Sequence, residues 1–478
     1  MKRILLVFLL IISLNFPVYE SYAEPKFSDC LLPRASWSHV SLGAPLALER
    51  LGNKSKVRFG ILPFHFKDSE LSNLTEDEKS DYFSAAKLIE KLSGNQVSVE
   101  LVFFPTIRSS LNYSQARQML ADRDIGWATW NLSKSTFGIV KETVKSADQS
   151  VDFSNLDGVI LINKSEMLPP GVAEAFLFFR TPANLNFFKR GLDLGYNFSF
   201  HESLITQEGL IDNAILLDRR YSVATIAHEM LHNFGLTDLY GPSTPPSIYA
   251  LSLMASDQLR LLNYEKAVLG WMPLNRIKCY NLADYLARSP KEATFTIEDI
   301  GEDHLVIFKV SNQEAYFVEV LDYSDNRLMI FYRLKMEERP PIEVLSVKDS
   351  NNSWTKNATT FSINDIGKSF VALEFQLLFS NRVGQTATFH IVPNNAYASA
   401  AYADLLVQAS ENRNRALEIE KTKQEAEAKA AAELKAKQEA EAKVKVAKKK
   451  TTIACVKGKL TKKVTSVNPK CPAGYKKK

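Results

Sequence analysis

Residues 225–241, TIAHEMLHNFGLTDLYG, place two histidines four positions apart and a glycine three positions after the second. On a helix, His228 and His232 lie one turn apart on the same face, so both imidazoles can reach one metal ion at about 2.0–2.1 Å. Gly235 can adopt the left-handed conformation that ends a helix, which turns the chain back and brings Asp238 toward the same ion. The pattern therefore predicts a helix, a sharp turn and a metal site.

Glu229 follows the first histidine and projects beside the imidazoles instead of toward the ion. Two neutral imidazoles and one carboxylate leave zinc a fourth position for water, which is the catalytic arrangement. Because zinc lowers the pKa of bound water to about 7, a neighbouring carboxylate can take the proton. We therefore predict one catalytic zinc ion held by His228, His232 and Asp238, with Glu229 as general base. An amphipathic helix that merely carries two histidines is the simpler alternative, but here one segment supplies the ligands, the base and the turn.

The other histidines have no partner at ligand spacing, so we interpret them as structural. They are His39, His65, His201, His304 and His390.

The segment HEMLHNFGLTDLYG resembles the extended HExxHxxGxxD motif of the immune inhibitor A-like secreted metallopeptidases, which are relatives of the metzincins. Residues 250–258, ALSLMASDQ, resemble the methionine-containing turn beneath the zinc site of that family, with Met254 as its methionine. Residues 264–273, YEKAVLGWMP, are similar to the Leu-Gly-Trp stretch that follows. The resemblance spans roughly Val40 to Leu334 and implies a metzincin-like zinc endopeptidase that acts on proteins or peptides.

The first residues carry Lys2 and Arg3, an apolar run from Ile4 to Leu14, and a polar stretch that ends at Ala23. The run is about half of the ~20 residues that a membrane span needs, so we predict a signal peptide over residues 1–23 and export from the cell. An uncleaved anchor is the alternative, and no later apolar run is long enough to span. The family often carries a long propeptide, whereas here only a short lead, residues 24–55, precedes the first predicted strand.

Four cysteines in an exported chain most simply form two disulfides. Their order along the chain favours Cys30–Cys279 and Cys455–Cys471, although the sequence alone allows three pairings. In a second interpretation, Cys30 is a propeptide thiolate that caps the zinc ion.

The net charge of +5 is unevenly distributed. Residues 443–478 hold thirteen lysines and no acid, and the first residues add two cations, which leaves the remainder with a net charge of −10. The body of the protein is therefore acidic, which argues against nucleic acid as a partner. The basic tail favours attachment to an anionic cell-surface polymer, with a merely solubilising tail as the alternative. An acidic exported body also suits Ca²⁺, although no loop carries convincingly spaced acidic ligands.

Strands and helices alternate up to about Pro273, which predicts an α/β (α+β) catalytic domain over residues 56–275. Short β-branched and aromatic runs between Ala293 and Val392 then predict an all-β sandwich over residues 276–395. An Ala/Glu/Lys-rich helical spacer is predicted over residues 396–450. Its low-complexity segment, residues 411–450, predicts a solvated single helix roughly 60 Å long, at ~1.5 Å per residue. A weak coiled-coil dimer is the alternative for this stretch. Residues 451–478 are predicted to form a small, basic tail that is closed by a disulfide.

Three functional hypotheses fit these patterns. The first is a secreted zinc metalloendopeptidase. The second is a catalytically inactive, zinc-containing binding or adhesion protein of the cell surface. The third is a structural surface protein whose long helix sets its reach. An intact Glu229 favours the enzyme, because a zinc site without catalysis would not need a general base.

Overall fold

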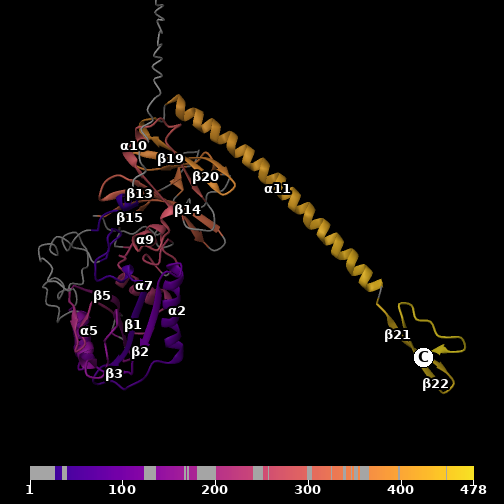
Figure 1. The fold of residues 1–478 in the computed structure, drawn as a ribbon, viewed down its shortest axis with the longest axis horizontal. Helices are drawn as coiled ribbons and strands as arrows, with labels where there is room; N and C mark the ends of the chain where they lie inside the picture. Colours follow the sequence, from indigo (N-terminus) through magenta and orange to yellow (C-terminus); the bar gives the residue numbers. More distant parts are fainter. Residues whose placement is uncertain are drawn as a thin grey trace, which may run out of the picture.

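The computed structural model of the chain describes residues 27–34, 40–122, 136–165, 168, 172–179, 201–240, 251–256, 258–298, 304–323, 326–336, 341–345, 347–348, 354–355, 365–396, 399–447 and 449–478. The predicted signal peptide, residues 1–23, lies outside the described residues. Figure 1 shows a body with an α/β part and a β-rich part, from which one long helix projects.

A seven-stranded sheet forms the centre of the α/β part, in the order β2-β1-β4-β9-β5-β6, with β3 beside β1. All neighbouring strands run parallel except β5 and β9, which are antiparallel. The strands are β1 (Lys56–His65), β2 (Ser98–Phe103), β3 (Ile107–Arg108), β4 (Gly158–Asn163), β5 (Ala173–Phe179), β6 (His201–Glu202) and β9 (Asn213–Leu217). A separate short hairpin consists of β7 (Leu204–Ile205) and β8 (Leu210–Ile211).

Helices cover both faces of this sheet, because alternate residues of each strand point to opposite sides. In β4, Ile160 and Ile162 join the hydrophobic cluster that contains α2 and α7. Val159 and Leu161 join the cluster that contains α3 and α5. The helices are α2 (Glu76–Leu92), α3 (Tyr113–Ala121), α5 (Thr136–Ala147) and α7 (Val223–Phe234), with the shorter α9 (Asn263–Val268) after them.

The β-rich part contains two sheets that share one hydrophobic core. The first sheet consists of β10 (Ile277–Asn281), β12 (His304–Lys309), β13 (Glu314–Tyr323), β14 (Asn326–Lys335) and β15 (Ile342–Val344). The second consists of β11 (Thr294–Glu298), β20 (Thr386–Pro393), β19 (Phe375–Val383), β18 (Ser369–Val371), β16 (Val347–Lys348) and β17 (Trp354–Thr355).

The β-rich part departs from the expected all-β arrangement at its start. A short helix, α10 (Leu282–Leu286), follows β10, and β10 pairs with β12 in parallel. The segment FVALEFQLLF, residues 370–379, forms parts of two strands, because the chain turns back between Val371 and Phe375 and the two strands pair with each other.

The first β sheet is buried on both faces. Phe317 and Tyr332 stack with ring centroids 5.0 Å apart and belong to the same hydrophobic cluster as helix α7. Tyr264 of α9 packs against Phe317, with ring centroids 4.4 Å apart. The α/β part and the β-rich part are therefore joined through a continuous hydrophobic core and not through an exposed linker.

Both predicted disulfides are present, between Cys30 and Cys279 and between Cys455 and Cys471. Their Cα atoms lie 5.9 Å and 5.6 Å apart, within the usual range for a disulfide. The second interpretation of Cys30 is therefore wrong, because a sulfur bonded to Cys279 cannot act as a thiolate that caps zinc.

The long helix α11 runs from Ala400 to Ala447, slightly inside the predicted spacer. Figure 1 shows it leaving the β-rich part and carrying a small sheet at its far end. That sheet has the order β22-β21-β23 and is closed by the second disulfide. Its strands are β21 (Thr451–Lys457), β22 (Leu460–Ser466) and β23 (Lys476–Lys477). Within the described part of the chain, none of the helices has the length and apolarity to cross a membrane.

Candidate metal centre

Helix α7 is capped at both ends, and it ends at Gly235 as the sequence predicts. The Ser222 hydroxyl accepts a hydrogen bond from the Thr225 amide at 3.1 Å, which caps the first turn. Gly235 ends the helix with φ +119°, in the left-handed region. The amides of Gly235 and Leu236 both donate to the Leu231 carbonyl, at 3.1 and 3.2 Å, so the chain reverses after the second histidine.

This reversal brings Asp238 against the two histidines. Its Oδ1 atom lies 3.1 Å from His228 Nε2 and 3.3 Å from His232 Nε2. The two imidazoles stand nearly perpendicular, with ring centroids 4.8 Å apart. In the parts of the chain that the structure describes, no other set of three His, Cys, Asp or Glu residues could hold a metal ion.

Main-chain carbonyls fix the orientation of both imidazoles. His228 Nδ1 donates to the Leu253 carbonyl and His232 Nδ1 donates to the Leu236 carbonyl, each at 2.8 Å. Since a carbonyl can only accept, the proton of each neutral ring sits on Nδ1 and the Nε2 lone pair faces Asp238. Two Nε2 atoms and one carboxylate oxygen that face one another repel unless the imidazoles are protonated or a cation lies between them, so the donor set fits a metal ion.

The electrostatics of the centre also favour a cation. Burial lowers the pKa of His232, but the Asp238 and Glu229 carboxylates outweigh this effect and raise the pKa to about 9. Burial raises the pKa of Asp238, yet the two imidazoles hold it well below its ordinary value. A carboxylate that stays ionised under these conditions is a strong ligand for a positive ion.

Glu229 lies beside the ligands and is buried. Burial raises its pKa above the ordinary value for glutamate, while the two histidines act in the opposite direction. The backbone amide of Ala175 donates a hydrogen bond to this carboxylate, which places β5 directly beside it. The side chain is thus held next to the ligand set by the sheet.

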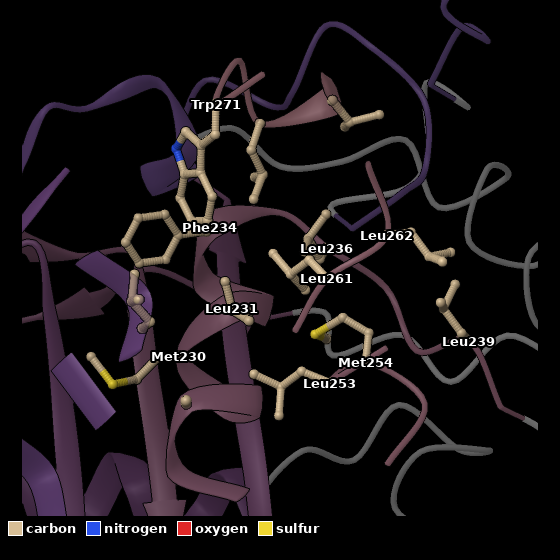
Figure 2. Packing of buried hydrophobic residues seen from close by; sticks show 14 of the residues in the cluster. Met230, Leu231, Phe234, Leu236, Leu239, Leu253, Met254, Leu261, Leu262 and Trp271 are labelled. Atoms are coloured by element: carbon tan, nitrogen blue, oxygen red, sulfur yellow. The ribbon is translucent and has the colours of Figure 1, made fainter. Parts of the chain in front are cut away.

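The segment around Met254 supports both halves of the centre. The Leu253 carbonyl holds His228, and the Met254 carbonyl accepts a hydrogen bond from Leu239, the neighbour of Asp238, at 2.9 Å. Figure 2 shows the Met254 side chain packed among buried leucines beside the helix. The turn is tied in place by the Ser252 hydroxyl, which accepts from the Met254 amide at 3.0 Å and donates to Glu265 at 2.6 Å.

Sequence reasoning missed these supporting groups. The carbonyls of Leu236 and Leu253 and the amide of Ala175 are main-chain atoms, so no side-chain pattern could reveal them. Glu265 could have been noticed only as an acid inside the apolar stretch YEKAVLGWMP.

The remaining described histidines have other partners. His65 Nε2 accepts a hydrogen bond from the Ser72 amide at 2.7 Å, and His390 Nδ1 donates to the Pro290 carbonyl at 2.9 Å. His304 lies against Arg276. His39 and the side chain of His201 lie outside the described part.

Comparison with models of known protein families gave no match, and comparison with curated proteins gave none either. The functional argument therefore rests on the sequence pattern and on the geometry of the site.

Proposed function

We propose that the protein is a secreted zinc-dependent endopeptidase of the metzincin-like, immune inhibitor A-like kind, which hydrolyses peptide bonds of proteins. One observation carries the proposal. A single oxygen of Asp238 faces the Nε2 atoms of His228 and His232, and the buried Glu229 lies beside them. Two intramolecular disulfides are consistent with an extracellular protein.

The ion would be held by His228, His232 and Asp238. Zinc bound there supplies a Lewis acid that polarises the substrate carbonyl and lowers the pKa of a water molecule. Glu229 takes a proton from the attacking water onto its carboxylate and then gives that proton to the leaving amine. The raised pKa of Glu229 suits this double role, because the group must both accept and release a proton.

The outer edge of β5 offers a place for an extended peptide. The Ala175 amide donates to Glu229, so it points away from β9, the antiparallel neighbour of β5. Because main-chain groups alternate in an antiparallel pair, Ala173 presents its amide and carbonyl to the same side as Ala175. Strand β6 pairs with β5 only at Phe178 and Phe179, so no described strand covers this side of β5 at Ala173 and Ala175. A substrate that added as a strand to this edge would have its backbone beside Glu229.

The decisive experiment uses Glu229→Gln. This variant should fold, be exported and carry zinc, but its rate of casein cleavage should fall by a factor of about 10²–10⁴ or more, because the general base is lost. Glu208→Gln, which changes an exposed glutamate, is the matched control and should cleave like wild type. A zinc chelator should abolish wild-type cleavage, and added zinc should restore it.

Two outcomes would contradict the enzyme. Cleavage by Glu229→Gln at nearly the wild-type rate would mean that this glutamate is not the base. A zinc-loaded wild type that cleaves no protein would favour the inactive surface-binding protein, for which both forms behave alike.

We further propose that the basic tail attaches the protein to an anionic cell-surface polymer. Residues 449–478 contain ten lysines and no acid, and they form the small sheet at the far end of α11. The lysines of this sheet can attract an anionic polymer. Because the sheet lies at the far end of α11, the acidic body with the proposed catalytic centre can stay away from that polymer.

A further inference from the structure

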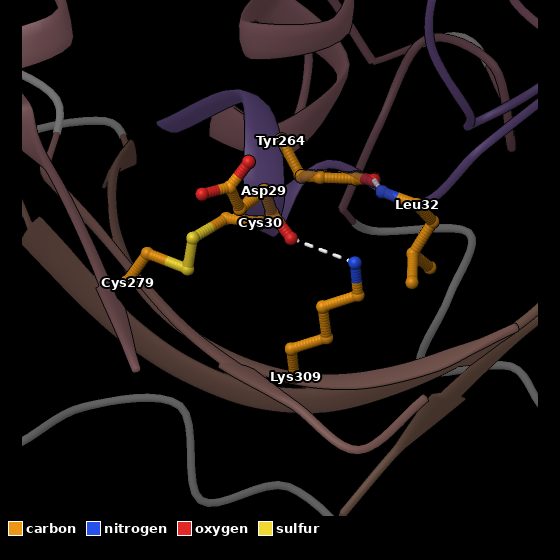
Figure 3. Close-up of a disulfide and its surroundings, with 6 residues drawn as sticks. All are labelled: Asp29, Cys30, Leu32, Tyr264, Cys279 and Lys309. Carbon is orange, nitrogen blue, oxygen red and sulfur yellow. Dashed lines mark hydrogen bonds between the residues drawn. A yellow bond between two sulfur atoms is a disulfide. The ribbon is translucent and has the colours of Figure 1, made fainter. Parts of the chain in front are cut away.

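The N-terminal lead is anchored at three points, two in the β-rich part and one in helix α9. Cys30, in the short helix α1 (Phe27–Cys30), is bonded to Cys279 of β10. The Lys309 ammonium donates to the Asp29 carbonyl at 2.7 Å, and the Leu32 amide donates to the Tyr264 hydroxyl at 3.0 Å. Figure 3 shows these contacts side by side above the first β sheet.

Residues 40–52, which we call the clamp, continue from this anchor to the end of helix α7. The Ser41 amide donates to the Gly235 carbonyl at 2.9 Å. A Cβ atom added at Gly235 would lie 2.9 Å from Leu46 Cδ2 and 3.5 Å from the Arg50 side chain. A Cβ atom added at Gly52 would lie 2.7 Å from the Phe234 carbonyl. The clamp therefore packs directly on the turn that leads to Asp238.

The clamp is also tied to the central sheet. The Arg50 side chain is 1 % exposed and donates to Asn213 Oδ1 at 2.9 Å, and Asn213 Nδ2 donates back to the Glu49 carbonyl at 3.2 Å. Leu42, Leu46 and Leu51 belong to the same hydrophobic cluster as α7. Removal of the clamp would expose this apolar surface and leave the Gly235 carbonyl and the buried Arg50 partners without their hydrogen bonds.

We propose that the clamp is a permanent positioning element of the metal centre, and that the lead is not an activation segment removed from the mature enzyme. The clamp holds the Gly235 turn, and the turn holds Asp238 against the two histidines. An inhibitory segment would instead leave the folded enzyme intact when it departs. This inference rests on the proposed metal centre, but it does not require the centre to be catalytic.

Zinc affinity, measured by competition with a chelator, tests the clamp directly. Leu46→Ala removes packing against Gly235 and should weaken zinc binding by about 10–100-fold, the usual effect of losing support around a ligand. Leu48→Ala is the matched control, because Leu48 is 93 % exposed whereas Leu46 is 6 % exposed. Ser41→Pro, which lacks the amide that Gly235 needs, should act like Leu46→Ala. Ser41→Ala keeps that amide but removes the hydroxyl that accepts from the Gly43 amide at 2.9 Å, so it should weaken zinc binding less than Ser41→Pro.

A mass measurement on the secreted, zinc-loaded protein keeps the inference testable if a clamp variant fails to fold. Under reducing conditions the mass should correspond to a chain that still contains Cys30 and the clamp. A zinc-loaded chain that begins after Asn53 would overturn the inference, and so would unchanged zinc affinity in both Leu46→Ala and Ser41→Pro. Because neither readout is proteolysis, a failure of the proposed enzyme activity would leave both results interpretable.

Discussion

Asp238 is the central residue of the candidate metal centre, since one of its oxygens faces both imidazoles. Removing this carboxylate leaves two neutral imidazoles, which hold zinc weakly and in no fixed geometry. Without Asp238 the site also lacks the negative charge that favours a cation between the two histidines.

We therefore expect Asp238→Ala to lose most of its zinc on dialysis and to show no cleavage of casein. Metal analysis of the purified variant, compared with wild type and with Glu229→Gln, checks the expectation. Glu229→Gln should keep its zinc, because Glu229 is not a ligand. Full zinc occupancy and normal cleavage in Asp238→Ala would place the third ligand elsewhere.

At this scale the sequence reveals ligands more readily than their supports. The spacing of His228, His232 and Gly235 carries information because a helix repeats every 3.6 residues and a left-handed turn favours glycine. The carbonyls of Leu236 and Leu253 carry none, because every residue has a carbonyl and only the fold decides which one meets an imidazole. The same holds for Ser41, whose contribution is a main-chain amide.

The junction between helix α9 and strand β13 contains two fully buried acids. Glu265 accepts hydrogen bonds from Ser252 and from the Leu262 amide, and Glu319 accepts one from the Asn263 amide. Burial raises the pKa of Glu265 to about 7 and that of Glu319 to about 8. This junction links the turn around Met254 to the β-rich part.

These acids should make stability depend on pH. Each stays protonated in the folded protein at pH values where the unfolded chain, with a glutamate pKa of 4.5, has released the proton. Their contribution to stability is therefore complete below about pH 4.5 and is lost as pH rises toward 7 and 8. We expect the melting temperature of the zinc-free protein to fall between pH 5 and pH 8, and to fall less in Glu319→Gln. An equal fall in wild type and variant would show that Glu319 does not hold its proton.

At the scale of elements, apolar patterning locates strands but not their partners. The continuous apolar run of β4 agrees with its burial between two layers of helices. The run AYFVEVLD predicts a strand equally well, yet nothing in it shows that both faces of β13 are buried and that Glu319 lies inside the core. Long-range packing decides this, because α9 and the second β sheet cover opposite faces of the same strand.

Helix α11 divides into a docked part and an exposed part. Leu405, Ala409 and Ala416 are buried against the β-rich part, whereas Leu417, Ile419 and Leu434 are exposed. A helix of 48 residues is about 72 Å long. The Ala, Glu and Lys content made this helix predictable, because these residues favour helices even without packing. The docked beginning was not predictable, since it depends on the surface of β19 and β20.

The reach of this helix leads to a prediction for the whole molecule. A chain that ends at Glu420 keeps the docked residues Leu405, Ala409 and Ala416, so its melting temperature and its casein cleavage should match those of the full chain. It lacks every lysine of the tail and should lose retention on cells. Retention of the full chain should weaken as salt rises, because screening shortens the range of attraction between exposed charges.

A chain that ends at Asn395 is the control for the docked part. It lacks Leu405 and Ala409 and should melt at a lower temperature than the chain that ends at Glu420, because it exposes the apolar surface around Leu378 and Val392. Comparing the three chains separates loss of fold from loss of attachment. Equal retention of the full chain and the chain that ends at Glu420, at low salt, would leave the tail with a solubilising role only.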